Sequence, residues 1–314
     1  MTAPEVRDTA EDIAEMEIRG AATIARAAAD ALEAQAVESD ADTPEAFRAE
    51  LRAAARRLRD TRPTAVSLPN ALRYVLREVE GDSVEALRES TVSAAEAFRA
   101  NLDRAQEDLG AVGANRLRDG DTIMTHCHST DALACVRAAL DDGKELSAIV
   151  KETRPRKQGH ITAKQLREWG VPVTIIVDNA ARRYLDDVDH VLVGADSIAA
   201  DGSVINKIGT SGLAVNARER GTPIMVAAQT LKLHPDTLTG HTVEIEMRDE
   251  AEVFTEDDRA EVGDVDVENP AFDVTPPRYV DAIVTERGQF PPESIVTLMR
   301  ELYGEGDTEP WEEE

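Results

Sequence analysis

The spacing of apolar residues divides the chain into a helical first part and a mixed second part. From the N-terminus onward, apolar residues recur at intervals of three and four, as in EDIAEMEIRGAATIARAAADALEAQ, and this period is typical of amphipathic helices. Thr43 and Pro44 predict a helix that runs to about Arg59, because a capping hydroxyl and a proline at the first helical position both favour a helix start. Alanine-rich helices with an apolar stripe favour a bundle, so we expect a helical N-terminal domain over residues 1–117.

The pattern changes after Asp119-Gly120-Asp121. Short β-branched runs now alternate with helical stretches, and the runs are DTIMTHC, LSAIVKE, VPVTIIVD, HVLVGADSI and TPIMVAAQ. Near-continuous apolar strands separated by helices indicate a parallel, doubly wound sheet. We therefore expect an α/β fold, in which residues 118–314 form a catalytic domain around a mostly parallel sheet.

One segment of this second domain is less regular. Residues 236–277 are strongly acidic and show no sustained period. Two short strand-like pieces, VEIEM and YVDAIVTE, lie within or after the segment. We predict a long excursion from the sheet before its last strand.

Acidic residues strongly outnumber basic ones. The chain has 62 Asp and Glu against 35 Lys and Arg, which gives a formal net charge of -27. A nucleic-acid binder needs a basic face to neutralise phosphates, so we expect no nucleic-acid partner. Disorder requires low hydrophobicity, whereas 42% of this chain is hydrophobic. We therefore expect a folded, halophilic protein whose self-repulsion is screened by a high-salt cytoplasm.

The cysteine content and the apolar stretches bear on the compartment. The two cysteines, Cys127 and Cys135, do not make a disulfide framework. No apolar stretch approaches the roughly 20 residues that span a bilayer, so no membrane partner is expected. The N-terminal segment is acidic and has no apolar core, unlike a signal peptide. These features predict a soluble, cytoplasmic protein.

The residues that follow each predicted strand are the candidates for chemistry. Ligands of open α/β sheets bind in the crevice outside the carboxyl ends of the strands. The first run ends at Cys127, the fourth ends at Asp196, and the fifth leads into Lys232. All six lysines lie between residues 144 and 232, which raises the expectation that each is used. One edge of the sheet thus collects a thiol, carboxylates and cations.

Cys127 has a functional and a structural interpretation. It is expected where a strand meets a helix N-terminus, whose N–H groups favour anions and lower the pKa of a thiol. Alternatively it is a small buried hydrophobe, as free cysteines often are, and Cys135 is expected in the core. His126 and His128 flank Cys127, but adjacent strand residues face opposite sides and no second Cys/His pair has zinc-like spacing, so no metal is expected.

Asp196 ends an apolar run, where partial desolvation would raise its pKa and suit it to acid–base work; a cap on the following turn is the alternative. Asn206 and Lys207 precede a helix and make a plausible oxyanion or phosphate grip. The nucleotide patterns G-x-G-x-x-G and G-x-x-x-x-G-K-[ST] are absent. Arg19 interrupts a helical stretch and Arg62 lies in a loop, and either could be a plain surface charge.

Four segments together resemble a known family. They are THCHS, KETRPRKQG, GADSIAADGSVINKIGT and NPAFDVTPP. The family unites methylthioribose-1-phosphate isomerase, ribose-1,5-bisphosphate isomerase and the α, β and δ regulatory subunits of the translation-initiation guanine-nucleotide exchange factor. The resemblance covers nearly the whole chain and implies a helical N-terminal domain followed by a Rossmann-like domain. IRGAA at 18–22 and RPTAVSLPNALRYV at 62–75 most resemble the archaeal ribose-1,5-bisphosphate isomerase branch.

The resemblance also implies roles for individual residues. Cys127 and Asp196 would be the catalytic pair, which the regulatory subunits generally lack. Substrate contacts would come from Arg19, Gly20, Ala21, Ala22, Arg62, Ser129, Thr130, Asp131, Asn206, Lys207 and Lys232. Thr130 and Asp131 stand where some relatives carry a Lys and a small residue, and His128 stands where many isomerases of the family carry Asn.

The activity that the resemblance implies is isomerisation of ribose 1,5-bisphosphate to ribulose 1,5-bisphosphate in AMP degradation, without cofactor or metal. Asp196 would protonate the ring oxygen while a Cys127 thiolate takes the C2 proton, through a cis-phosphoenolate. Methylthioribose 1-phosphate is an alternative substrate, although Arg19 and Arg62 argue for two phosphates. A non-catalytic regulatory subunit is the other alternative. The resemblance further implies homo-oligomers, either dimers or hexamers, and activation by AMP.

Overall fold

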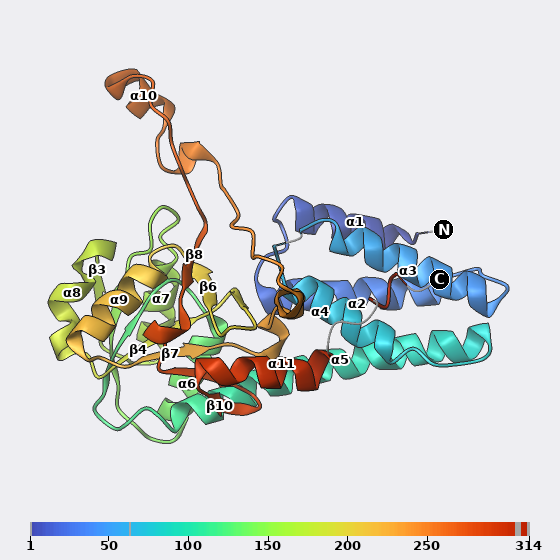
Figure 1. Ribbon diagram of the computed structural model, residues 1–314, viewed down its shortest axis with the longest axis horizontal. Coiled ribbons are helices and arrows are strands. Elements are labelled where there is room, and N and C mark those ends of the chain that lie inside the picture. Colours follow the sequence, from blue (N-terminus) through green and yellow to red (C-terminus); the bar gives the residue numbers. More distant parts are fainter. Residues whose placement is uncertain (1, 63, 305–308, 313–314) are drawn as a thin grey trace. The chain divides into compact units, whose positions relative to one another are not determined.

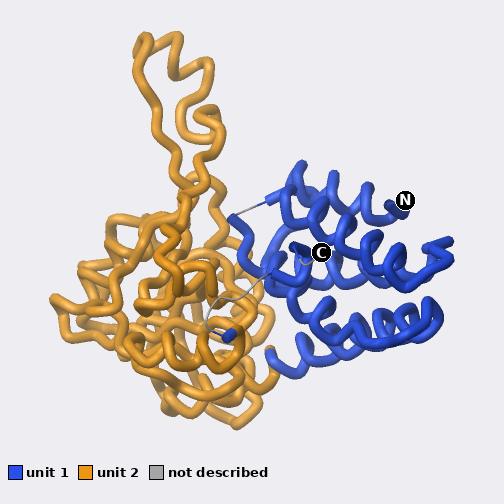
Figure 2. The backbone as a smooth tube through the Cα atoms, turned by 45° about the vertical axis from the view of Figure 1, so that its right-hand side comes forward, with its two compact units in different colours: residues 1–105, 304–314 blue, residues 106–303 orange. Residues whose placement is uncertain are grey.

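The computed structural model describes residues 2–62, 64–304 and 309–312. These residues form two compact units, coloured separately in Figure 2. Unit 1 comprises Met1–Ala105 and Gly304–Glu314, and unit 2 comprises Gln106–Tyr303. The boundary falls inside one long helix, α5 (Val84–Ala114), which contributes residues to both units.

Unit 1 is helical. Its helices are α1 (Pro4–Ala14), α2 (Ala21–Glu38), α3 (Pro44–Arg59), α4 (Ser67–Arg77) and the first part of α5. The Thr43 hydroxyl accepts a hydrogen bond from the Ala46 N–H at 3.2 Å, so the predicted start and end of α3 are confirmed. The C-terminal segment returns to this unit, where Arg73 Nε donates to Glu309 at 2.8 Å.

A seven-stranded sheet organises unit 2. Its order is β10-β9-β7-β4-β1-β2-β3, and every neighbouring pair is parallel except β9 with β10. The strands are β1 (Thr122–Thr125), β2 (Ser147–Lys151), β3 (Val173–Ile176), β4 (His190–Gly194), β7 (Ile224–Ala227), β9 (Ala282–Thr285) and β10 (Gly288–Phe290). The prediction of a doubly wound, mostly parallel sheet is confirmed, and each of the five apolar runs supplies one of its strands.

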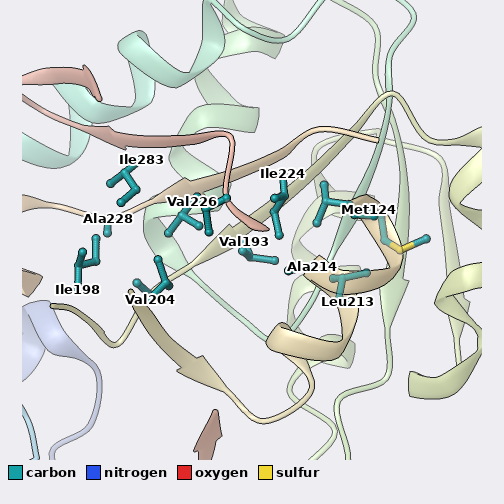
Figure 3. Close-up of a cluster of buried hydrophobic side chains, with 14 of the residues drawn as sticks. Met124, Val193, Ile198, Val204, Leu213, Ala214, Ile224, Val226, Ala228 and Ile283 are labelled. Carbon is teal, nitrogen blue, oxygen red and sulfur yellow. The ribbon is translucent and has the colours of Figure 1, made fainter. Parts of the chain in front are cut away.

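Helices cover both faces of the sheet. They are α6 (Thr130–Asp141), α7 (Gly159–Glu168), α8 (Ala181–Tyr184), α9 (Thr210–Arg220) and α11 (Ile295–Tyr303). Alternate residues of β4 enter opposite cores: Val191 and Val193 pack with α8, α9 and α11, whereas Leu192 packs with α6, α7 and the end of α5. Figure 3 shows the first of these cores, in which Val193 and Val226 of the sheet face Leu213 and Ala214 of α9.

A second, antiparallel sheet lies beyond β4. It consists of β5 (Ser197–Ile198), β6 (Val204–Lys207) and β8 (Phe272–Thr275), in the order β5-β6-β8. The predicted run HVLVGADSI is therefore divided between two sheets. Asp196 lies in the short link between them, where its N–H donates to Ile205 O at 2.9 Å.

The acidic excursion leaves unit 2 as an arm that carries α10 (Glu256–Val262), as Figure 1 shows. The prediction that VEIEM forms a strand is wrong. Residues 243–247 are all described, and they form a single isolated bridge, Met247 with Pro270, because no neighbouring segment continues the ladder. Of the helices in the described part of the chain, none is both long enough and apolar enough to cross a membrane.

Candidate active site

The order of the sheet reverses between β1 and β4. The chain builds β1, β2 and β3 in one direction and then returns to place β4 on the other side of β1. Ligands of doubly wound sheets bind in the crevice at such a reversal, outside the carboxyl ends of the strands. Cys127 follows β1 by two residues and Asp196 follows β4 by two residues, so the topology brings both to this crevice.

The backbone of Cys127 is held in an unusual conformation. Its φ is +69°, in the left-handed region that non-glycine residues rarely adopt. The Cys127 N–H donates to Thr153 Oγ1 at 2.9 Å, and the Cys127 carbonyl accepts from Thr162 Oγ1 at 2.8 Å. Strained residues of this kind persist only where their surroundings determine them fully. Two threonines from neighbouring segments therefore fix where the sulfur lies.

His126 extends this network and its tautomer follows from the contacts. Burial and the nearby Lys151 ammonium lower the pKa of His126 to about 3, so the ring is neutral at pH 7. Its Nε2 lies 2.8 Å from the Ile208 carbonyl, which can only accept, so Nε2 carries the hydrogen. Nδ1 is then an acceptor, 3.2 Å from the Thr153 hydroxyl, whose oxygen in turn accepts the Cys127 N–H.

The Cys127 thiol is buried, and this residue is 8% exposed. Cys135 is fully buried in the core, as predicted. Burial raises the pKa of Cys127 to about 11; the Lys207 ammonium opposes this rise and the Asp196 carboxylate adds to it. The expectation that a helix N-terminus would lower the pKa is wrong, because desolvation outweighs it and α6 begins only at Thr130.

Asp196 lies near both the thiol and Lys207. Its negative charge adds to the rise in the pKa of Cys127. Burial lowers the pKa of Lys207 and the Asp196 charge opposes that change, so all three groups share one electrostatic environment. The expectation that the Asp196 side chain would be partly desolvated is wrong for the free protein, in which Asp196 is exposed. The apolar run ends at Ala195, which is buried, and the chain leaves the sheet at the next residue.

Asn206 and Lys207 end β6 and face different ways, because neighbouring strand residues alternate. The Asn206 amide donates to Thr210 Oγ1 at 3.0 Å, at the start of α9. Lys207 is 6% exposed, its Nζ lies 4.6 Å from the centre of the Phe272 ring, and it donates to Ala271 O at 2.9 Å. Burial and then the Arg248 charge lower the pKa of Lys207.

The start of α6 holds three of the predicted contacts. Ser129 caps the helix by accepting from the Ala132 N–H, and it lies so close to β4 that a Cβ on Gly194 would come within 2.2 Å of its hydroxyl. Asp131 is 1% exposed and forms an ion pair with Lys232 Nζ at 2.8 Å. Thr130 is exposed, and its carbonyl accepts from the Gln106 side chain at 3.4 Å.

The remaining predicted contacts belong to unit 1, whereas Cys127 and Asp196 belong to unit 2. Gly20 has a φ of +88° directly before α2, which begins with Ala21 and Ala22, so this glycine occupies a conformation that side chains rarely adopt. Arg19 is exposed and donates to Met16 O. Arg62 is half-buried in the loop before α4. Their roles stay predictions.

One recess of unit 2 brings the predicted residue Lys207 together with residues outside the predicted set. This small recess, open to solvent, is lined by Thr153, Arg154, Pro155, Arg156, Gln158, Lys207, Ile208, Arg248, Asn269, Pro270 and Ala271. The Gln158 Oε1 atom is buried, with no hydrogen-bond partner in the part of the chain that the structure describes. Gln158 lies in the recognised KETRPRKQG segment, so its polar side chain after β2 was a usable signal; Arg248 lies in the irregular excursion, where no pattern marks it.

Comparisons with known proteins place the chain in one family. A family model described as the Initiation factor 2 subunit family matches residues 17–292. A curated relative named ribose 1,5-bisphosphate isomerase, from Haloferax volcanii, is 77% identical over 99% of this chain and 96% of its own length. A Pyrococcus horikoshii structure titled translation initiation factor eIF-2B has a TM-score of 0.79 at 30% identity, covering 93% of this chain and 99% of that one. The structure of 5-methylthioribose 1-phosphate isomerase from the same organism has a TM-score of 0.75 at 34% identity, covering 95% and 87%.

Proposed function

The chain belongs to the Initiation factor 2 subunit family, and we propose that within this family it is an enzyme that isomerises ribose 1,5-bisphosphate to ribulose 1,5-bisphosphate. The observation that carries the proposal is the pairing of Cys127 with Asp196 at the reversal of the sheet, beside the buried cation of Lys207. The 77% identity to a relative of that name supports the choice of substrate.

The proposed reaction needs one acid and one base. The anomeric oxygen of the substrate is phosphorylated, so the ring does not open to a free aldehyde. Asp196 donates a proton to the ring oxygen as the C1–O4 bond breaks, while the Cys127 thiolate removes the C2 proton, and a cis-phosphoenolate forms. Cys127 then returns its proton to C1, and Asp196 recovers one from the C2 hydroxyl, which becomes the ketone. Both groups end as they began.

The free protein holds the thiol protonated, since burial raises its pKa to about 11. A proton must therefore pass from the thiol to the carboxylate as substrate binds. A substrate that covers the exposed Asp196 removes its carboxylate from water, which favours the neutral, proton-donating form.

Two further parts of the proposal concern context. We place the reaction in AMP degradation, in a high-salt cytoplasm, with AMP as an activator and with homo-oligomers of dimer or hexamer size. The similarity to 5-methylthioribose 1-phosphate isomerase keeps that sugar as a second candidate substrate. A regulatory role like that of eIF-2B would require neither Cys127 nor Asp196.

The test is turnover by the purified protein in multimolar salt. Ribose 1,5-bisphosphate and methylthioribose 1-phosphate are supplied in parallel, and products are followed by phosphorus and carbon NMR. We expect ribulose 1,5-bisphosphate from the first sugar. Cys127→Ser and Asp196→Asn should each lower kcat by roughly 10²- to 10⁴-fold, the range for a lost acid or base. Full activity in either variant, or turnover of the methylthio sugar alone, would refute the proposal.

A further inference from the structure

The base of the acidic arm places a cation, Arg248, at the recess that Lys207 and Thr153 also line. Arg248 N donates to Asn269 O at 2.9 Å, and Ala271 N donates to Glu246 O at 2.8 Å, so the two sides of the arm are joined where it leaves the sheet. The Asn269 amide adds a bond to Asp249 O at 2.8 Å. These bonds hold Arg248 at the wall of the recess, with its side chain only 11% exposed.

Arg248 and Lys207 lie on the same aromatic ring. The Arg248 guanidinium carbon is 5.8 Å from the centre of the Phe272 ring, and Lys207 Nζ is 4.6 Å from it. Both residues line the recess together with Thr153, which holds the Cys127 backbone. Arg248 is thus close to Lys207 and to the segment that positions the sulfur.

Two like charges on mostly buried side chains repel each other unless an anion lies between them. The Arg248 charge lowers the pKa of Lys207, which shows that the two cations repel each other in the free protein. Glu246 offsets part of this repulsion, since its carboxylate accepts from Arg248 Nε at 3.1 Å. A phosphoryl group would offset the repulsion more fully than Glu246 does. A guanidinium can bind such a group through two parallel N–H bonds, and an ammonium binds it as a point charge.

We propose that Arg248 is a further substrate-binding residue, which joins Lys207 in holding a phosphoryl group of the substrate beside Cys127. The inference rests on the proposed function for the identity of the substrate, but the anion site it describes does not depend on which sugar phosphate is used. In this proposal the base of the acidic arm has a role in substrate binding, because it supplies Arg248.

The test measures access to Cys127 rather than turnover. The intact protein is alkylated with neutral iodoacetamide at constant ionic strength, with and without inorganic phosphate or pyrophosphate, and labelling of Cys127 is separated from that of Cys135 by peptide mapping. We expect both anions to slow alkylation of Cys127. Arg248→Gln should raise the pyrophosphate concentration needed for half-protection at least tenfold, and KM for ribose 1,5-bisphosphate should rise by a similar factor.

A second reagent reports the local charge. Iodoacetate is an anion, so the ratio of its rate to that of iodoacetamide should fall in Arg248→Gln. Arg248→Lys keeps the positive charge but lacks the paired N–H donors of a guanidinium. It should therefore keep the ratio of the two alkylation rates and lose part of the protection by pyrophosphate. Arg259→Gln is the matched control, because Arg259 lies on the same arm but pairs with Glu250 and Asp264.

The outcomes separate the two proposals. If Arg248→Gln and Arg248→Lys keep the protection and the rate ratio of the unaltered protein, the inference is wrong. If only Arg248→Lys folds, its loss of protection relative to Arg259→Gln supports the inference, and unchanged protection overturns it. Failure of the unaltered protein to turn over ribose 1,5-bisphosphate would refute the proposed function but leave the phosphate protection in place.

Discussion

The residues that follow β1 and β4 have opposite surroundings, although Cys127 and Asp196 both lie at the crevice where the order of the sheet reverses. After β1, Cys127 is buried, its backbone has a left-handed conformation, and this backbone forms hydrogen bonds with two threonines. After β4, Asp196 is exposed on a link between two sheets. The difference teaches that the protein itself holds the backbone of Cys127 and buries its side chain, whereas it leaves Asp196 open to contact from outside.

Apart from replacement of Cys127 or Asp196 themselves, the largest expected effect comes from breaking the hydrogen-bond network that holds Cys127. Thr153→Val removes the acceptor of the Cys127 N–H and the partner of His126 Nδ1, while it keeps the shape of the side chain. A buried donor without a partner costs about 1–3 kcal/mol, so the left-handed turn should relax. We expect kcat to fall roughly ten- to hundredfold with little change in KM, since a misplacement of about 1 Å can cost a hundredfold.

Thr153→Ser is the control for this prediction, because it keeps the hydroxyl and should restore most of kcat. Steady-state kinetics on both variants, with thermal unfolding to confirm folding, provide the measurement. A Thr153→Val enzyme with normal kcat would show that the thiol is not positioned through this threonine.

A smaller effect is expected from the electrostatic interaction between Asp196 and Cys127. The Asp196 charge raises the pKa of Cys127, so Asp196→Asn should lower it and increase the thiolate fraction at any pH below that pKa. Alkylation of Cys127 by iodoacetamide at pH 8 should therefore be faster than in the unaltered protein, because the thiolate is the reacting form. In the unaltered protein the rate should keep rising with pH beyond 9, toward the pKa of about 11.

The measurement is the rate of Cys127 alkylation from pH 7 to 11 for both proteins. Asp236→Asn serves as the control, because Asp236 is not among the charged groups that shift the pKa of Cys127. An unchanged pH profile in Asp196→Asn would mean that the two groups do not interact.

The smallest expected effect concerns the second thiol. Cys135 is fully buried in the core between α6 and α5, and its sulfur lies 3.4 Å from Asp131 O. Cys135→Ala should change kcat and KM by less than about twofold and cost about 1–2 kcal/mol of stability, as small core truncations do. Denaturant unfolding and kinetics measure both quantities; a large loss of activity would mean that this cysteine also serves the reaction.

Several structural features could be predicted from local pattern alone. Thr43 and Pro44 marked the start of α3, and the five apolar runs marked strands, because capping and side-chain alternation depend on neighbours in the sequence. The position of Cys127 and Asp196 after strands β1 and β4 also followed from these runs. Resemblance to a family, rather than pattern, supplied the roles of the pair.

The sequence pattern misled where the outcome depends on distant segments. VEIEM has the composition of a strand, but no partner continues beyond the bridge of Met247 with Pro270. Arg248 could not be singled out, because it enters the recess only through the pairing of the arm's two sides with each other.

By itself, the sequence determined the helices of the first part of the chain, five strands of the parallel sheet and the side chains that follow those strands, since these depend on short-range periodicity and capping. Only the tertiary structure decided the chemical state of those side chains. Burial raised the pKa of Cys127 where a helix end alone would have lowered it, and Asp196 came to lie in solvent. The physical reason is that desolvation and charge interactions depend on everything packed around a group, and those neighbours come from segments far apart in the chain.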